Sequence, residues 1–300
     1  MPESEDAFRL DVARLRASFD RASSGYEAAA ALQARVSAEL LARLGELRLA
    51  PRVLLDLGAG TGRVTRELKH RYPRSLVIAL DIAPGMLREA RRHQRLWRRF
   101  ARVCADARRL PLADGSVDVV FSSLMLQWCE PLEAALAEVR RVLNPAGLFA
   151  FSTFGPDTLK ELREAWTQAD SREDAHNHVN RFLDVHDVGD AAARSGLAEP
   201  VLDVERIELG YPDALALMRD LKAIGAHNVT AGRARSLTGK ARLARMQAAY
   251  ELKRRDGHLP ATWEVIFGVA WGAPGRAAAV SVQGEAHIAP GSIRHAGRLP

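Results

Sequence analysis

The sequence has only two cysteines, Cys104 and Cys129, among its 300 residues. A disulfide framework needs more cysteines than this, and both lie in apolar segments, so we expect two reduced, buried thiols in a cytoplasmic protein. No stretch approaches the roughly eighteen continuous apolar residues that cross a bilayer, so no membrane association is expected. The first residues are acidic and lack the apolar core of a signal peptide, which argues against a secretory leader.

The overall charge is positive, because 43 Lys and Arg residues exceed 37 Asp and Glu residues, giving +6 and an isoelectric point near 9.7. A basic chain favours an acidic partner, and nucleic acid, an anionic membrane and an acidic carrier protein all qualify. The sequence offers no motif of stacking aromatic residues, so stable binding of nucleic acid is not expected. A hydrophobic content of 47% is ordinary for a globular protein with a substantial core.

Apolar runs with the character of strands alternate with helical runs after residue 50. This alternation predicts an α/β fold of the Rossmann-like, doubly wound type, with a mostly parallel sheet and helices on both faces. The expected strands are 53–57, 76–80, 100–104, 117–121 and 148–152, and the expected helices between them are 63–71, 84–98 and 132–143.

Further segments surround this core. Residues 1–50 form a helical lead that we expect to act as a lid on a domain spanning 51–272. Helical insertions are expected at about 155–184 and 211–259, with a helix at 186–195 and strands at 201–209 and 262–271. Residues 273–300 are rich in Ala, Gly and Pro without periodicity, which predicts a disordered tail.

A glycine-rich turn follows the first expected strand. Its backbone can approach a ligand closely, and the next helix offers unpaired N–H groups. The spacing is Gly-x-Gly-x-Gly, and an arginine stands where a dinucleotide-binding fingerprint has its third glycine. Asp56 precedes the turn, where its carboxylate would repel a pyrophosphate but attract an ammonium group. The predicted ligand-binding residues here are Asp56, Gly58, Ala59, Gly60 and Gly62.

Two more acidic residues end successive strands. Asp81 follows the second strand, where a carboxylate can accept hydrogen bonds from ribose hydroxyls, and Asp106 follows the third, where it can accept from an adenine amino group. Either acid alone is more often a helix cap or a loop residue. Together with Asp56 they form a set at one edge of the sheet, the edge at which open α/β sheets bind ligands.

These motifs resemble those of the class I S-adenosylmethionine-dependent methyltransferases. Residues 56–62 match the family's first motif, Asp81 the second, residues 106–107 the third, and residues 110–111 the loop that follows. The resemblance implies S-adenosylmethionine as cofactor and a seven-stranded sheet whose last two strands, 201–209 and 262–271, form a reversed hairpin. It extends the predicted cofactor-binding set to Ile82, Met86, Ala107 and Ser122.

Segments outside the core resemble the malonyl-[acyl-carrier protein] O-methyltransferases of biotin synthesis. The similarity covers about residues 14–272, and the segment after Gly272 has no counterpart. The matching stretches are 19–22 with Tyr26 and Gln33, 126–129, 151–163, Phe182, Asp184, 186–187, 189–190, 225–228 and 259–265. The resemblance implies that the acceptor is the free carboxylate of a malonyl thioester on acyl carrier protein.

The implied chemistry needs no catalytic base, because a carboxylate with an ordinary pKa of about 4 is already ionised at neutral pH. The sequence shows no Ser-His-Asp or Cys-His arrangement, which agrees with an enzyme that orients its substrate and removes water from it. We expect Tyr26, Trp128 and His186 to wall the acceptor site, although each could equally be a core residue. Arg163 and Arg181 are the candidate cations for the malonyl group.

The basic segment 219–255 contains ten Lys or Arg residues and two acidic ones. Acyl carrier proteins are acidic, so this segment is a candidate docking surface, represented by Lys222, Arg242 and Arg245. The alternative is a solvated helix face. His176 and His178 are spaced like metal ligands, but no third ligand is evident and no metal is expected.

Two other functions compete with this interpretation. A methyltransferase-like arginine hydroxylase, an assembly factor of mitochondrial complex I, has similar Gly-x-Asp-Thr-Leu and Pro-Ala-Thr regions, but the segments 127–129 and 263–265 and the absence of a transit-like N-terminus favour the biotin family. A noncatalytic, basic RNA-binding module is the second alternative, and it should bind with a steep salt dependence.

Overall fold

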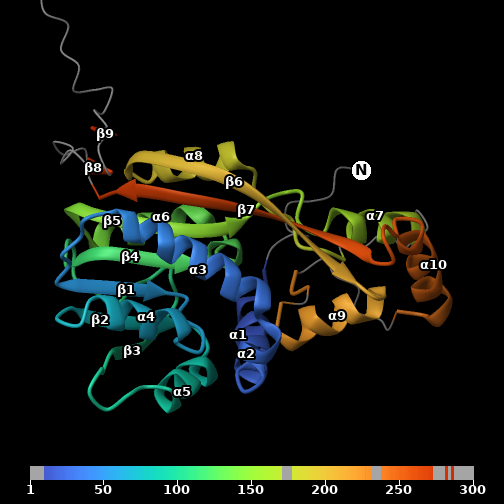
Figure 1. Cartoon of the computed structure of the whole chain (residues 1–300), viewed down its shortest axis with the longest axis horizontal. Helices are drawn as coiled ribbons and strands as arrows, with labels where there is room; N and C mark the ends of the chain where they lie inside the picture. Colours follow the sequence, from blue (N-terminus) through green and yellow to red (C-terminus); the bar gives the residue numbers. More distant parts are fainter. Residues whose placement is uncertain are drawn as a thin grey trace, which may run out of the picture.

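The computed structural model describes residues 10–170, 178–226, 228–230, 238–272, 281–282 and 285–286. Its centre is a seven-stranded sheet in the order β3-β2-β1-β4-β5-β7-β6 (Figure 1). The strands are β1 (Val53–Leu57), β2 (Leu76–Asp81), β3 (Ala101–Cys104), β4 (Val117–Ser123), β5 (Leu143–Phe154), β6 (Ala198–Tyr211) and β7 (Leu259–Trp271). A separate pair, β8 (Ser281–Val282) and β9 (Glu285–Ala286), is antiparallel.

The pairing confirms the predicted topology. Strands β1 to β5 run parallel, whereas β7 is antiparallel to both β5 and β6. Successive side chains of a strand point to opposite faces, and β1 shows why the sheet is covered on both. Leu54 packs into one apolar core and Leu55 into the other, and both are fully buried.

Helices cover the two faces. On one face lie α3 (Ala31–Glu46), α4 (Arg63–Arg71) and α5 (Pro84–Arg92), and on the other lie α6 (Leu132–Val142) and α8 (Val185–Arg194). The remaining helices are α1 (Val12–Ala22), α2 (Tyr26–Ala29), the 3-10 turn η2 (Leu126–Trp128), α7 (Lys160–Ala169), α9 (Ala214–Ala223) and α10 (Lys240–Glu251).

The two expected insertions pack on each other. Helices α7 and α10 are in contact at one end of the long β6–β7 hairpin, with α9 nearby (Figure 1). A buried ion pair joins them, because Arg242 of α10 lies 2.6 Å from Asp170 at the end of α7. His178 also pairs with Asp170 at 3.1 Å and stacks on Trp166, with ring centroids 4.0 Å apart.

Three sequence predictions about local structure are wrong. Helix α5 ends at Arg92 rather than residue 98, because the chain turns at His93 and residues 93–100 form a loop. Strand β5 begins at Leu143 rather than at residue 148. Cys104 is exposed rather than buried, because β3 is an edge strand. Most of the predicted tail lies outside the described residues, which within it comprise only the short strands β8 and β9.

Among the described residues, no helix combines the length and apolar character needed to cross a bilayer.

Candidate functional site

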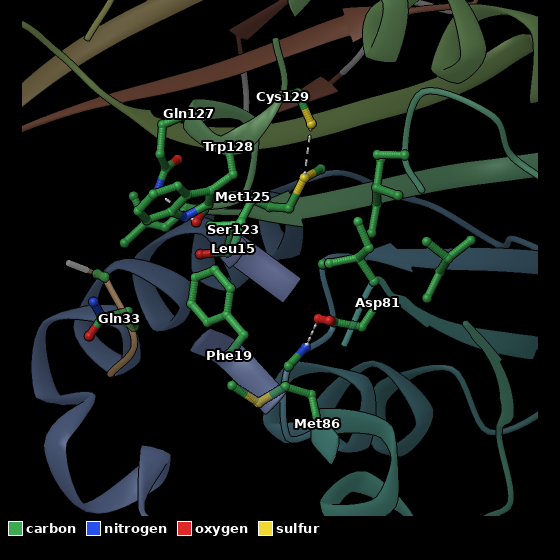
Figure 2. A pocket seen from close by; sticks show the side chains of 18 of the residues that line it. Leu15, Phe19, Gln33, Asp81, Met86, Ser123, Met125, Gln127, Trp128 and Cys129 are labelled. Atoms are coloured by element: carbon green, nitrogen blue, oxygen red, sulfur yellow. Dashed lines mark hydrogen bonds between the residues drawn. The ribbon is translucent and has the colours of Figure 1, made fainter. Parts of the chain in front are cut away.

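A cavity, which we call the main cavity, lies at the carboxyl ends of β1 to β4 (Figure 2). Helix α1 lies beside these strand ends (Figure 1) and lines the cavity. The wall of the cavity on the strand side consists of Leu57, Gly58, Gly60, Leu80, Asp81, Ile82, Met86, Ala105, Asp106, Ala107 and Arg108. A smaller cavity adjoins it, because both are lined by Tyr26, Gln33, Gly58, Gly60 and Ser123. Asp56, Ala59 and Thr61 line the smaller one.

The glycines of the turn have different roles. Gly58, Gly60 and Gly62 all have left-handed backbones, with φ of +80°, +54° and +74°. A Cβ on Gly60 would meet no protein atom within 4 Å, so this glycine keeps cavity space open. A Cβ on Gly62 would lie 2.8 Å from the side chain of Ala90, so Gly62 permits α4 to pack against α5 and does not line either cavity.

Asp56 is a buried carboxylate, with 2% of its surface exposed. Thr65 donates a hydrogen bond of 2.5 Å to it. Burial raises the pKa of Asp56 to about 7, an effect to which the negative charge of Asp81 adds and which the bond from Thr65 partly offsets. Among the described residues, no ion pair satisfies this carboxylate, so the smaller cavity suits a ligand that brings an ammonium group.

Asp81 and Asp106 line the main cavity beside it. Asp81 (Figure 2) accepts hydrogen bonds from the backbone N–H groups of Gly60 at 2.9 Å and Ala83 at 2.8 Å, and burial raises its pKa. Asp106 pairs with Arg108 at 2.7 Å, and hydrogen bonds from this guanidinium lower the pKa of Asp106. Three acids therefore follow three neighbouring strands, an arrangement that fits S-adenosylmethionine through its amino, ribose and adenine groups.

The opposite wall of the cavity is largely apolar and comes from segments far apart in the sequence. Phe19 projects from α1 between Trp128 and Met86 (Figure 2), and its ring meets Trp128 edge-on with centroids 5.5 Å apart. Sequence reasoning did not select Phe19 as a site residue, because a phenylalanine on a helix carries no signal of its own. The other residues of this wall are Val12, Leu15, Tyr26, Gln33, Ser123, Leu124, Met125, Gln127, Cys129, Phe154, Ile224, Ala226 and Trp263.

Tyr26 and Trp128, two of the residues predicted to wall the acceptor site, both line the main cavity. Burial, together with the negative charge of Asp81, raises the pKa of Tyr26 well above its ordinary value. Tyr26 therefore stays a neutral phenol, able to donate a hydrogen bond at any physiological pH.

Besides Gly62, four predicted site residues line neither of these two cavities. His186 is exposed on α8 and lines neither cavity. Arg163 and Arg181 line a separate cavity beside α7, and Arg163 donates to the carbonyl groups of Pro156 at 3.0 Å and Thr158 at 2.8 Å. Ser122 is buried and donates to the carbonyl of Leu57, and it is Ser123 that faces the cavity, because alternate residues of a strand face opposite ways.

The three predicted docking residues differ in how exposed they are. Arg242 is mostly buried by its ion pair with Asp170, so its assignment to a docking surface is wrong. Arg245 is exposed and donates to the carbonyl of Ala169, and Lys222 is exposed on α9.

Residues 155–161 belong to one of the stretches that resemble the malonyl-[acyl-carrier protein] O-methyltransferases. They connect β5 to α7 and are hydrogen-bonded to β7. Glu264 of β7 accepts a hydrogen bond from the N–H of Asp157 at 2.7 Å, and Glu161 accepts from the N–H of Thr262 at 3.0 Å. A Cβ on Gly155 would lie 2.8 Å from the Glu264 carboxyl group, so this position needs glycine. These residues shape the fold and do not line the main cavity.

His176, half of the suggested metal pair, lies outside the described residues. Within the described part of the chain, no group of three or more His, Cys, Asp or Glu residues is arranged to hold a metal ion.

Comparisons with known proteins agree with this geometry. Residues 55–151 match a family model described as a methyltransferase domain. A malonyl-[acyl-carrier protein] O-methyltransferase of Methylovorus sp. is 54% identical over 273 residues, which cover 89% of this chain and 90% of the relative. One from Laribacter hongkongensis is 53% identical, covering 89% and 91%. In its fold, the chain is similar to the YcgJ protein from Bacillus subtilis, with a TM-score of 0.56, 16% identity, and 80% and 99% coverage.

Proposed function

The chain belongs to the malonyl-[acyl-carrier protein] O-methyltransferase family, and on this premise we propose that it methylates the free carboxylate of a malonyl thioester on acyl carrier protein. S-adenosylmethionine is the methyl donor, and the product is the methyl ester that enters biotin synthesis. The observation that carries the proposal is the extent of the identity. It covers 89% of the chain and so extends well beyond the matching methyltransferase domain, which spans residues 55–151.

The cofactor supplies an activated methyl group bonded to a positively charged sulfur. Three acidic residues of the chain bind the other polar groups of the cofactor. Asp56 faces the amino group, Asp81 accepts from the ribose hydroxyls, and Asp106 accepts from the adenine amino group. Since Asp56 and Asp81 are both buried acids with raised pKa values, a cationic ligand relieves their mutual repulsion when it binds.

The acceptor needs positioning rather than activation. A malonyl carboxylate is ionised at neutral pH, so no residue has to remove a proton from it. Its oxygen must lie about 3–3.5 Å from the methyl carbon and in line with the sulfur. Phe19 and Trp128 form an apolar wall that can exclude water from a weak, otherwise hydrated nucleophile. We assign α1, which carries Phe19, the role of a lid.

The described residues that line the main cavity offer no unpaired cation to the carboxylate of the acceptor. Among the described residues that line it, the only cationic side chain is Arg108, and this side chain is bound to Asp106. Tyr26 and Gln33 are the polar residues that can donate hydrogen bonds to the acceptor from the lid side. Neutral donors orient a carboxylate and leave it more nucleophilic than a direct ion pair would.

The competing functions receive less support. The relatives that match over most of the chain are named as malonyl-carrier methyltransferases, and none of those reported above is named as a hydroxylase or an RNA-binding protein. We also infer a cytoplasmic location, because both cysteines are free thiols.

A comparison of carrier-bound substrates tests the proposal. The protein is incubated with S-adenosylmethionine and either malonyl- or acetyl-carrier protein, and formation of S-adenosylhomocysteine is followed. We expect turnover with the malonyl carrier only, because the acetyl group has no free carboxylate. Equal turnover with both, or turnover with neither, would contradict the proposed acceptor.

A further inference from the structure

One short segment, residues 88–102, carries the net charge of the whole chain. It contains seven arginines and a single acidic residue, Glu89. The chain has 43 basic and 37 acidic residues, so 36 of each remain outside this segment. The rest of the protein is therefore balanced, and the formal excess of +6 is concentrated in fifteen residues.

The segment comprises the second half of α5, the loop after it and the start of β3. Leu87 and Ala90 of α5 are buried against the sheet, which leaves Arg88, Arg91 and Arg92 on the exposed side of the helix. The loop continues this surface with the exposed Arg95, Arg98 and Arg99, and β3 adds the exposed Arg102. We call residues 88–102 the arginine surface.

Two large apolar side chains stand in its middle. Trp97 is 95% exposed and Leu96 is 73% exposed. Isolated exposed apolar residues are common, but an exposed tryptophan with several arginines beside it in the chain has the composition of a binding hot spot, and the adjacent Leu96 enlarges its apolar surface.

Most of these seven arginines form no ion pair with the described part of the protein. Arg92 pairs with Glu89, and Arg88 approaches Asp20 at 3.5 Å. Among the described residues, Arg91, Arg95 and Arg98 make no ion pair. The basic helix α10 and its end differ, because Lys253 and Arg254 pair with Glu164 and Glu251, and Arg242 pairs with Asp170.

The arginine surface begins at the rim of the cavity. Met86 lines the cavity, and Arg88 follows two residues later on the same helix. Arg92 follows Met86 by six positions along the helix, a rise of about 9 Å. Asp20 of α1 accepts a hydrogen bond from the N–H of Gly85 in α5, so α5 also contacts the lid (Figure 1). A partner bound along α5 would lie beside the lid.

We propose that the arginine surface docks the acidic acyl carrier protein, with Trp97 and Leu96 as its apolar centre. This inference rests on the proposed function and moves the docking site from residues 219–255 to α5 and the loop after it. A carrier fits better than single-stranded nucleic acid, which stacks on several aromatic residues where this surface offers one. It also fits better than a membrane, because the substrate itself arrives on an acidic protein.

The test compares two substrates and two sets of charge reversals. The docking variant is Arg91→Glu, Arg95→Glu, Arg98→Glu. The matched control is Arg48→Glu, Arg52→Glu, Arg74→Glu, which reverses three exposed arginines outside this surface. At low salt we expect kcat/KM for malonyl-carrier protein to fall about tenfold or more in the docking variant, and less than about twofold in the control. With a small malonyl thioester, both should stay within about twofold of wild type.

The salt dependence and a Trp97 variant distinguish the electrostatic contribution of the arginine surface from its apolar contribution. Added salt should lower the wild-type kcat/KM for the carrier and affect the docking variant less, because the screened attraction is already gone. Trp97→Ala should lower kcat/KM for the carrier several-fold at both low and high salt, because apolar contacts are not screened. If the charge-reversed protein fails to bind the cofactor normally, the milder Arg91→Gln, Arg95→Gln, Arg98→Gln variant takes its place.

Several results would overturn the docking proposal. Equal losses on both substrates, or no loss on either, would exclude a docking role while wild-type turnover of the carrier substrate left the proposed function intact. Unchanged carrier kinetics combined with lost binding to phosphatidylglycerol vesicles would assign the surface to a membrane. Absence of wild-type turnover with malonyl-carrier protein would instead contradict the proposed function itself.

Discussion

Thr65 and Asp56 form a fully buried hydrogen bond in which the threonine hydroxyl donates to the carboxylate at 2.5 Å. Thr65 lies on the first turns of α4 and Asp56 near the end of β1, so the bond spans the glycine turn. It gives the carboxylate one donor but no positive charge, and burial still raises the pKa of Asp56 to about 7.

We therefore expect cofactor affinity to depend on pH. The cationic amino group favours the ionised form of Asp56, so binding below pH 7 must release a proton. Affinity should fall as the pH drops below 7, by up to about tenfold per pH unit. Titration calorimetry in buffers of different ionisation enthalpy measures the released proton directly. Asp56→Asn should bind more weakly and without that proton release, and identical proton release in this variant would exclude Asp56 as the titrating group.

The same pKa affects the stability of the protein without its cofactor. A carboxyl group whose pKa is raised on folding stabilises the fold at low pH, and this contribution is lost as the pH rises from about 4 through 7. Asp56→Asn removes the charge that folding disfavours. Its melting temperature without cofactor should exceed that of wild type at pH 8 and approach it at pH 4. A lower melting temperature at pH 8 would show that the Asp56 charge is compensated in the fold.

Gly60 and Gly257 provide a matched test of the glycine turn. Both have left-handed backbones, with φ of +54° and +78°, and a Cβ on either meets no protein atom within 4 Å. Valine should therefore strain both sites similarly, but only Gly60 lines the cavity. We predict that Gly60→Val weakens cofactor binding tenfold or more, about 1.4 kcal/mol, whereas Gly257→Val leaves it unchanged. Comparable cofactor affinities in the two variants would argue against this cofactor site.

Asp81→Ala should also weaken cofactor binding, by roughly tenfold to a hundredfold, because the ribose hydroxyls lose a charged acceptor. Gly60 would lose the acceptor of its backbone N–H as well. Calorimetry gives the affinity and thermal unfolding checks that the variant is folded. A folded Asp81→Ala protein with wild-type affinity would remove Asp81 from the site.

Arg242 should act on stability rather than on carrier recognition. Arg242 and His178 both contact the buried Asp170 carboxylate, so removing the guanidinium leaves that carboxylate with less compensating charge and destabilises the fold. Arg242→Met should therefore lower the melting temperature substantially, whereas Lys222→Met, on the exposed side of α9, should change it little. If Arg242→Met melts like wild type, the pair with Asp170 contributes little to the fold.

The methyl-transfer step should be nearly independent of pH between about 6 and 8, because the acceptor carboxylate is already ionised and no base is required. Single-turnover rates at saturating cofactor isolate this step from the pH dependence of cofactor binding. A rate that rises tenfold per pH unit across this range would indicate a base and a different acceptor.

The sequence predicted the features that depend on local patterns. The positions of the strands, the glycine turn and the strand-end acids Asp81 and Asp106 follow from alternating apolar runs and from residues at strand ends, whereas the reversed hairpin followed only from the family resemblance. Phe19 and Gln33 were not selected as site residues on physical grounds, because only the packing of α1 and α3 over the strand ends brings them to the cavity. Arg242 illustrates the opposite error, since its partner Asp170 is 72 residues away and the sequence showed only a charge.

Ser122 and the arginine surface show two further limits of prediction from the sequence. A one-residue error along a strand exchanges the two faces, which is why Ser123 rather than Ser122 lines the cavity. Trp97 lies in a stretch predicted to be helical, and only the end of α5 at Arg92 reveals it as the exposed centre of a loop.

The most direct test of the account is where the methyl group goes. Malonyl-carrier protein is incubated with the enzyme and S-adenosylmethionine carrying an isotopically labelled methyl group, and the acyl chain is then analysed by intact and fragment mass spectrometry. The account predicts one labelled methyl group per carrier, located on the terminal carboxylate of the malonyl group as an ester. A label elsewhere on the carrier, an added oxygen on an arginine, or an unlabelled carrier would contradict it.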